Sequence, residues 1–328
     1  MTDVSASAPG KVVLCGEYAV LHGAPAICMA VNRRAKVEVT DFEGDWHRVS
    51  APGFSSLEGR FIVDGAAVDW LQGEAEYRIV DSVWRSVISR ALGRAESRHL
   101  SITLDTRAFI DEASGKKIGI GSSAALTVAL TAALGQTTDV FSSAMRAHRL
   151  FQHGAGSGVD IATSSSGGLV DYHMNDAPAA TLRWPTGLTY RLIWTGVPAS
   201  TRMMLDKFEK AGRRSPRTTL VNAAERMAEA WHSASAVMSQ YPVYIEALRQ
   251  FSVDHDLGIF DAGHDKLVRE AAAAGLVYKP CGAGGGDVGI LLGTSDRHLD
   301  DFMTGKDESR CQVLACELDP DGVLLEQR

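Results

Sequence analysis

The sequence predicts an α+β protein of two layered domains. Apolar residues recur with a period of two in some stretches and of 3.6 in others, and both patterns occur in both halves. A chain of 328 residues is also longer than one typical domain. The turn at residues 185–187, Pro-Thr-Gly, is the best candidate for a boundary. We therefore predict an N-terminal domain over residues 1–185 and a C-terminal domain over residues 186–328.

In the first half, strand and helix patterns alternate along the chain. Residues 35–42, AKVEVTDF, alternate cleanly as a half-buried strand does, and the helix pattern of residues 76–93 ends at a glycine. A short strand, a turn and a second strand are predicted over residues 5–21. The remaining predictions are a strand at 99–106, helices at 122–134 and 142–154, a loop with a short helix at 156–168 and a strand at 168–172.

In the second half, four helices and three strands are predicted. The helices span roughly residues 201–210, 218–239, 244–254 and 264–274. The strands are VYKP (277–280), VGILLG (288–293) and CQVLACEL (311–318). Mixed elements in both halves are what two layered α+β domains require.

Composition excludes several classes of protein. The net charge of −7 argues against a general nucleic-acid surface, which is normally basic. Five scattered cysteines without a CxxC pair indicate reduced thiols rather than disulfides or zinc ligands. The first residues lack a signal-peptide pattern, and the longest apolar run, residues 124–134, is too short to span a bilayer. We therefore expect a cytoplasmic protein with neither nucleic-acid nor membrane partners.

A glycine cluster near the C-terminus needs an explanation. Residues 282–289 hold five glycines, and each costs backbone entropy on folding. A flexible linker would have polar flanks, whereas this cluster lies between the apolar stretches AAAAGLVYKP and VGILLG. The cluster is therefore either a tight turn or a loop whose backbone closely approaches a ligand.

A second unusual segment is KKIGIGSSAALTVAL, residues 116–130. A glycine turn that opens into a helix aims free N–H groups and the helix dipole at one point, which favours an anion. The segment matches neither a Walker A loop nor a dinucleotide fingerprint. The alternative is a serine cap on a buried, alanine-rich helix, and this stretch alone leaves both interpretations open.

The segment APGKVVLCGEYAVLHG, residues 8–23, precedes both in the chain and places Lys11 between a Pro-Gly turn and an apolar strand. Together and in this order, the three segments resemble the three motifs of the GHMP kinases, and they extend from residue 8 to residue 290. The resemblance implies an N-terminal domain similar to a ribosomal-protein fold and a C-terminal ferredoxin-like domain. It also implies that ATP and the substrate bind in the cleft between the two.

The resemblance carries roles to matching residues. It implies that Lys11 and Asp160 are catalytic, with helix capping as the alternative for Asp160, and that Ser123 is a ligand of Mg²⁺. The implied ATP-binding residues are Lys117, Gly119, Ile120, Gly121, Ser122, Ser123 and Ala124. The implied substrate-binding residues are Lys11, Glu17, Tyr18, Ser157, Gly158, Thr195, Ser200, Cys281, Gly282, Ala283 and Gly284.

Within the family, the phosphomevalonate kinases are the most similar branch. Mevalonate kinases usually have Gly-Glu-His where this chain has Gly16-Glu17-Tyr18, and a magnesium-binding glutamate where it has Arg149. The Lys116-Lys117 pair also resembles phosphomevalonate kinases, whereas His153 in HGxxSGVD is mevalonate kinase-like.

The resemblance therefore implies transfer of the ATP γ-phosphate to 5-phosphomevalonate. Asp160 would mainly orient Lys11 and the acceptor, with general-base work as the second option. Mevalonate phosphorylation is the alternative. A non-catalytic metabolite-binding homologue is disfavoured, because Lys11, Asp160 and the phosphate-loop serines are all present. The expected ligands are ATP, Mg²⁺ and phosphomevalonate, and both a monomer and a homodimer stay open.

Overall fold

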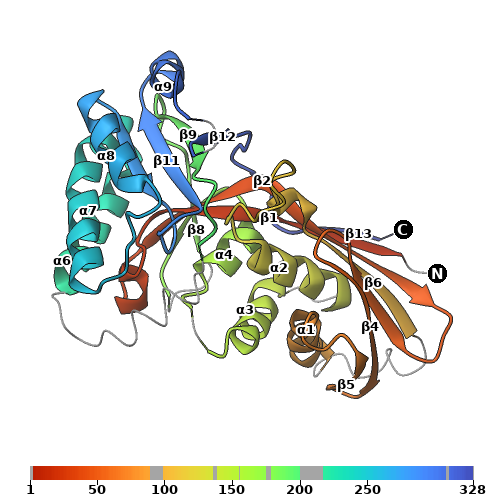
Figure 1. Cartoon of the computed structure of the whole chain (residues 1–328). Helices are drawn as coiled ribbons and strands as arrows, with labels where there is room; N and C mark the ends of the chain where they lie inside the picture. Colours follow the sequence, from red (N-terminus) through yellow and green to blue (C-terminus); the bar gives the residue numbers. More distant parts are fainter. Residues whose placement is uncertain are drawn as a thin grey trace.

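The computed structural model describes residues 3–88, 99–135, 139–154, 156–174, 179–199, 217–307 and 310–327. These residues form two lobes, each with its own sheet and helices (Figure 1). The predicted α+β class is thereby confirmed. In the described part of the chain, no helix is both long and apolar enough to cross a membrane.

The larger sheet is built around two long antiparallel strands, β1 (Val4–Cys15) and β2 (Ala26–Phe42). In the described residues it has nine strands, in the order β13-β1-β2-β6-β3-β4-β5, with β7 beside β2 and β8 beside β7. Only β3 and β6 pair in parallel. The other strands are β3 (His47–Ala51), β4 (Ser55–Asp64), β5 (Ala67–Gln72), β6 (His99–Asp105), β7 (Leu169–Tyr172), β8 (Ala180–Leu182) and β13 (Leu324–Gln327).

Helix α2 (Ser122–Gly135) packs directly on strands β1 and β2 of this sheet (Figure 1). Its small and apolar residues let neighbouring elements approach on nearly every side, so most of its side chains are buried. It is surrounded by α1 (Arg78–Ile88), α3 (Val140–Phe151) and α4 (Val159–Ser166). This packing fixes the N-terminus of α2 beside β1.

The smaller sheet has the order β10-β11-β9-β12 and is antiparallel throughout. Its strands are β9 (Thr189–Trp194), β10 (Val277–Pro280), β11 (Val288–Gly293) and β12 (Gln312–Leu314). Helices α8 (His264–Ala273) and α9 (Asp296–Met303) pack on it. Helices α6 (Arg217–Glu229) and α7 (Ala234–Asp254) pack against each other, and α6 also contacts the short 3₁₀ helix η1 (Ala19–His22).

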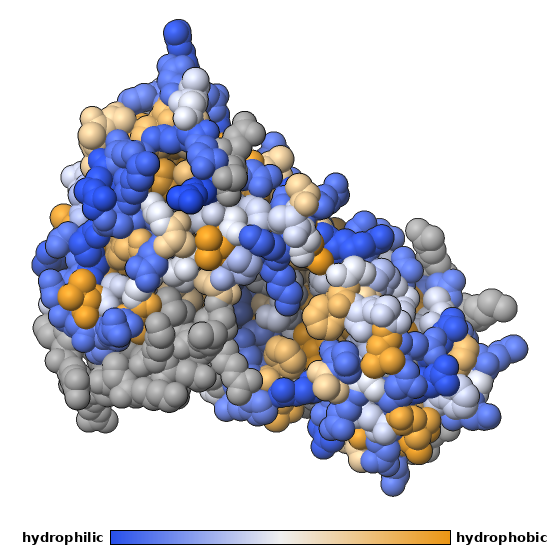
Figure 2. All heavy atoms as spheres, viewed as in Figure 1, coloured by the Kyte–Doolittle hydropathy of each residue, from blue (hydrophilic) through white to orange (hydrophobic). Residues whose placement is uncertain are grey.

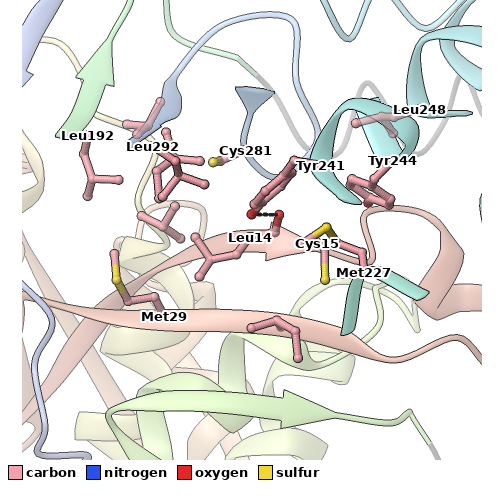
Figure 3. Packing of buried hydrophobic residues seen from close by; sticks show 14 of the residues in the cluster. Leu14, Cys15, Met29, Leu192, Met227, Tyr241, Tyr244, Leu248, Cys281 and Leu292 are labelled. Atoms are coloured by element: carbon pink, nitrogen blue, oxygen red, sulfur yellow. Dashed lines mark hydrogen bonds between the residues drawn. The ribbon is translucent and has the colours of Figure 1, made fainter. Parts of the chain in front are cut away.

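One hydrophobic core joins the two lobes. It combines residues of β1 and β2 with residues of α6, α7 and the smaller sheet. Figure 3 shows Tyr241 and Tyr244 leaving α7 beside β1, where the hydroxyl of Tyr241 donates to the carbonyl oxygen of Leu14 at 2.9 Å. Because β1 contributes to this core and to the larger sheet, it forms a shared support for both lobes.

The C-terminal segment returns to the larger sheet, where β13 pairs with residues 4–7 of β1. Arg34 of β2 holds this return: its guanidinium donates to the Asp319 carboxylate at 2.6 Å and to the carbonyl oxygens of Asp321 and Gly322. All strands of the four-stranded sheet come from residues after 186. Strand β13 also follows residue 186, but it belongs to the larger sheet. The boundary at 185/186 stays a prediction.

Three predicted elements differ from the structure. Residues 5–21 are one strand as far as Cys15, followed by η1, because the Pro-Gly pair is absorbed as an irregularity in the pairing with β2. The helix break lies at the 3₁₀ turn η3 (Ala230–His232) and Ser233, while α7 continues through Pro242. The strand predicted at 311–318 is only β12. The helix predicted at 201–210 lies outside the described residues.

Candidate active site

A cleft opens where the two lobes meet, and Figure 2 shows the surface hollowed there. It contains about 1350 Å³ of empty space, its open mouth included. Its walls come from β1, the turn after β1, residues 117–123, α4, residues 198–199 and the glycine loop 282–287. The predicted site residues that line it are Lys11, Glu17, Tyr18, Lys117, Gly119, Ile120, Gly121, Ser122, Ser123, Ser157, Asp160, Gly282 and Ala283.

The phosphate loop ends at the N-terminus of α2, as predicted. Gly119 and Gly121 have left-handed φ angles of 88° and 85°, and Ser122 begins the helix. The first hydrogen bond of the helix runs from the N–H of Ala125 to the carbonyl of Gly121. The N–H groups before Ala125 therefore have no acceptor inside the helix, and they are available to an anion at the cleft.

Lys11 lies between the phosphate loop and the glycine loop. Its backbone N–H donates to the carbonyl of Ile120 at 2.8 Å, which fixes β1 against the phosphate loop. Its side chain passes so close to Gly121 that a Cβ there would lie 3.0 Å from Lys11 Cγ, and a Cβ on Gly282 would lie 3.9 Å from Nζ. The Lys11 side chain thus lines the cleft between the two loops.

Asp160 reaches the cleft from the first turn of α4. The cap of this helix is Gly158, with a left-handed φ of 85°, so the capping role considered for Asp160 is wrong. One carboxylate oxygen accepts from the N–H of Ile161 at 2.9 Å. Between Lys11 and Asp160 the structure forms no ion pair, so the expected direct orientation of Lys11 by Asp160 is not seen.

The glycines of the cluster at residues 282–289 are required by backbone conformation and close packing. Four of them have positive φ, and a Cβ on Gly284 would lie 2.5 Å from Ile259 Cγ2 and 2.7 Å from its carbonyl oxygen. The N–H of Gly285 donates to that same carbonyl. Buried His264 holds the far end, with Nε2 2.9 Å from the carbonyl oxygen of Gly286. The glycine loop is therefore a close-packed turn that contributes Gly282 and Ala283 to the cleft wall, and not a flexible linker.

Asp287 joins the glycine loop to the phosphate loop. Its side chain occupies the space that a Cβ on Gly119 would need. One carboxylate oxygen accepts from the N–H of Ala199 at 2.9 Å. Burial raises the pKa of Asp287 to about 6, against the opposing effects of that hydrogen bond and of the Lys11 charge. A carboxylate this close to the phosphate loop affects the electrostatics of any anion bound there.

Side chains from α7 and β10 contact the turn after β1 on the side away from the cleft. The carboxylate of Glu17 forms a buried ion pair with Lys279 and accepts from the hydroxyl of Tyr244 at 2.6 Å. The hydroxyl of Tyr18 donates to the carbonyl of Ala283 at 2.8 Å, and burial raises its pKa. The first and third motifs are thus directly linked.

Other predicted site residues lie elsewhere. Ala124, Gly158, Thr195, Cys281 and Gly284 do not line the cleft, although each adjoins residues that do or supports the loops. Ser200 lies outside the described residues. The prediction missed lining residues that no motif marked, among them Phe109, Gln152, Pro198 and Ala199. Asp287 also lines the cleft, and its place at the end of the glycine cluster was the signal for it.

Among the described residues, no three His, Cys, Asp or Glu side chains gather closely enough to hold a metal ion. Arg149 is exposed, lies in a groove beside α1 and does not line the cleft. The Ser123 hydroxyl is 3.5 Å from Nε2 of buried His148. Ser123 stays a predicted ligand of Mg²⁺.

The structure has two lobes, a glycine turn at a helix N-terminus and a lysine between two glycine-rich loops. Together these features define a protein that binds phosphate groups. The chain is 30% identical to a phosphomevalonate kinase of Streptomyces sp. (strain CL190), over 87% of this chain and 88% of that protein. It is 27% identical to a mevalonate kinase of Aeropyrum pernix, over 98% of each. No protein-family model matches.

Among solved structures, the fold is similar to that of Streptococcus pneumoniae phosphomevalonate kinase in complex with phosphomevalonate and AMPPNP. The TM-score is 0.78 at 19% identity, over 96% of this chain and 99% of that one. The chain belongs to the GHMP kinase family, and it is a phosphotransferase. The family predicted from the three motifs is thereby confirmed.

Proposed function

We propose that this protein transfers the γ-phosphate of ATP to the phosphate of 5-phosphomevalonate, giving the 5-diphosphate and ADP. The observation that carries the proposal is the position of Lys11 between the phosphate loop and the glycine loop, in one cleft with Asp160. The similarity to a phosphomevalonate kinase over most of the chain supports this acceptor.

The residues of the cleft fit a nucleotide. The N–H groups at the start of α2 and the side chains of Lys117 and Lys11 present positive charge to phosphates. Mg²⁺ is usually held by phosphates, water and few protein groups, which fits the absence of a three-ligand cluster in the described residues. Ser123 would hold it at the helix N-terminus. When bound, the ion supplies charge neutralisation between the phosphates.

The chain's own residues then provide positioning and electrostatics. Phosphoryl transfer needs these more than covalent catalysis. Lys11 would neutralise charge between the attacking and transferred groups, since it faces both loops. Asp160 would orient the acceptor, because the structure gives it no direct contact with Lys11 through which to act.

Phosphorylation of the mevalonate hydroxyl is the second candidate, and one observation favours it. The Asp160 side chain lines the cleft without an ion pair to any described residue. A carboxylate in that state suits a general base, which an alcohol needs more than an anionic phosphate does.

The acceptor is identified by measuring ADP release with mevalonate, 5-phosphomevalonate and 5-diphosphomevalonate in turn. We expect turnover with 5-phosphomevalonate. Turnover with mevalonate alone would overturn the proposed acceptor and leave the family assignment intact.

The pH dependence of Asp160→Asn gives an independent test. A phosphate acceptor has a second pKa of about 6 and is ionised at neutral pH, so the variant should be slow with little recovery as pH rises. An alcohol acceptor predicts the opposite, because hydroxide partly replaces a missing base. A steep rise of the variant's kcat between pH 7 and 9 would therefore favour mevalonate.

A further inference from the structure

A buried charged cluster lies beneath one side of the cleft, and the proposed mechanism does not use it. It consists of Glu17 in the turn after β1, Lys279 at the end of β10 and Tyr244 in α7. The side chains of Glu17 and Lys279 are 1% and 0% exposed. Three elements far apart in the sequence thus meet at one point.

We propose that Tyr244 and Lys279 are positioning residues that align the acceptor side of the cleft, an inference that rests on the proposed function. Glu17 connects them to the cleft wall. Its carboxylate is also within 3.4 Å of the backbone N–H of Gly282, the first glycine of the glycine loop. Removing either partner would therefore shift both the first and the third motif.

Each contact of the cluster fixes a cleft residue. The hydroxyl of Tyr244 accepts from the N–H of Gly16 at 2.8 Å and donates to Glu17 at 2.6 Å, so one side chain sets the turn. The ammonium of Lys279 also donates to the carbonyl of Val13 at 3.2 Å and contacts Cys281 Sγ at 3.8 Å. Gly16, Glu17, Val13 and Gly282 all line the cleft.

Burial makes the cluster a positioning device rather than a simple source of stability. A buried ion pair recovers little net free energy, because desolvation offsets the attraction between its charges. The geometry must nevertheless stay intact, since a buried charge without its partner is costly. The surrounding backbone is consequently held in one arrangement.

The nucleotide side of the cleft is supported separately. The phosphate loop is fixed by the hydrogen bond from Lys11 N–H to Ile120 and by that from Ile118 N–H to the carbonyl of Phe109. No residue of the Glu17, Lys279 and Tyr244 cluster forms a hydrogen bond to residues 117–123. Loss of a cluster contact should hence affect the acceptor more than the nucleotide.

Tyr244→Phe tests this with a small change, and Tyr241→Phe is its matched control. Both tyrosines are fully buried in α7, and the Tyr241 hydroxyl donates to the carbonyl of Leu14 (Figure 3). For Tyr244→Phe we expect about a tenfold rise in the acceptor KM, the scale of one lost hydrogen bond to a charged group. The Kd for ADP, measured by calorimetry, should change less than twofold.

The control variant Tyr241→Phe should lose a similar amount of thermal stability and keep the acceptor KM. Equal effects of the two variants on KM, or a tenfold weaker ADP affinity in Tyr244→Phe, would overturn the proposal. All kinetics use whichever acceptor the wild type turns over. A wrong acceptor is therefore seen in the wild type, whereas a wrong positioning role is seen only in the comparison of variants.

Lys279 is tested by Lys279→Met and by the double variant Glu17→Gln/Lys279→Met, which removes both charges. The single variant leaves Glu17 buried and unpaired, so we expect a large loss of thermal stability. The double variant should recover that stability while its acceptor KM stays at least tenfold above wild type. Recovery of both stability and KM would show that the pair is only structural, and would overturn its positioning role.

Discussion

The side chain of Lys11 lies between the phosphate loop and the glycine loop. This position predicts a large contribution of its charge to catalysis. We expect Lys11→Met to lower kcat by roughly two to three orders of magnitude, the scale of one preorganised electrostatic donor. Steady-state kinetics with saturating ATP measure this. The fold should be unaffected, because no ion pair of Lys11 is lost, and a thermal melt checks it. A loss of less than tenfold in kcat would remove Lys11 from the mechanism.

Asp287 gives a prediction about stability and pH. Its pKa of about 6 in the folded state exceeds the usual value near 3.8, so the folded protein binds the proton more tightly than the unfolded chain does. The free energy of unfolding should therefore fall as pH rises from about 4 to about 6, by at most about 3 kcal/mol from this group. Asp287→Asn keeps an acceptor for Ala199 N–H and removes the titration.

Urea unfolding of wild type and Asp287→Asn at several pH values tests this. The variant should gain stability relative to wild type as pH rises from 4 to 6, and the difference should then level off. A difference that is constant over this range would mean that Asp287 does not titrate there.

At the scale of elements, the loop between β10 and β11 depends on one close approach. Gly284→Ala should abolish most activity and destabilise the protein, because the new Cβ would meet the backbone of Ile259 at a left-handed φ of 75°. Gly275→Ala is the matched control, since its φ is 71° but no atom lies within 4 Å of the added Cβ.

The control therefore measures backbone strain alone, about 1 kcal/mol. The free energy of unfolding of both variants is obtained from urea melts. Equal losses in the two would show that strain, and not close packing, explains the glycine at 284.

Elements with strong local patterns were predictable from the sequence. Helix α2, the short helix α4 and the strands β10 and β11 lie where the patterns placed them. The sequence prediction was wrong where tertiary contacts determine the local conformation. Pro9-Gly10 favours a turn, yet pairing with β2 keeps β1 extended past these two residues. Pro242 likewise favours a break, yet packing of α7 keeps the helix continuous.

In the candidate site, too, residues within local motifs were predictable and residues set by tertiary contacts were not. The motif residues Lys11, Ser123 and Gly282 meet in one cleft, as the resemblance implied. The partners of Glu17 could not be predicted: Tyr244 carries no motif signal, and Lys279, which stands just before the glycine cluster, gives no sign that it pairs with Glu17. Contacts set by the fold as a whole are not encoded in any local pattern.

For the whole molecule, Arg34 joins the C-terminal segment to the larger sheet. Its ion pair with Asp319 is mostly buried, with side chains 16% and 9% exposed. Arg34→Met leaves the Asp319 carboxylate without its cation and the carbonyl oxygens of Asp321 and Gly322 without the Arg34 donor, and we expect a loss of about 3 kcal/mol in the free energy of unfolding. The kcat should be unchanged, because Arg34 does not line the cleft.

Arg60→Met is the control for this prediction. Its ion pair with Glu58 is about 40% exposed on both sides, so the expected loss is less than 1 kcal/mol. Urea melts of both variants measure the free energy of unfolding. Comparable losses in the two variants would mean that burial of the Arg34–Asp319 pair adds no stability beyond that of an exposed pair.

The pairing of β13 with residues 4–7 of β1 also has a consequence for biosynthesis. On the ribosome, β1 emerges before the other described strands of its sheet, and β13, which pairs with its outer edge, emerges after them. Throughout translation, the nascent chain exposes unpaired backbone groups along that edge, and such an edge can pair with another chain. Contacts between residues far apart in the sequence also form slowly. Chaperones that shield the first strand should therefore raise the yield of native protein, and chains stalled before β13 should aggregate.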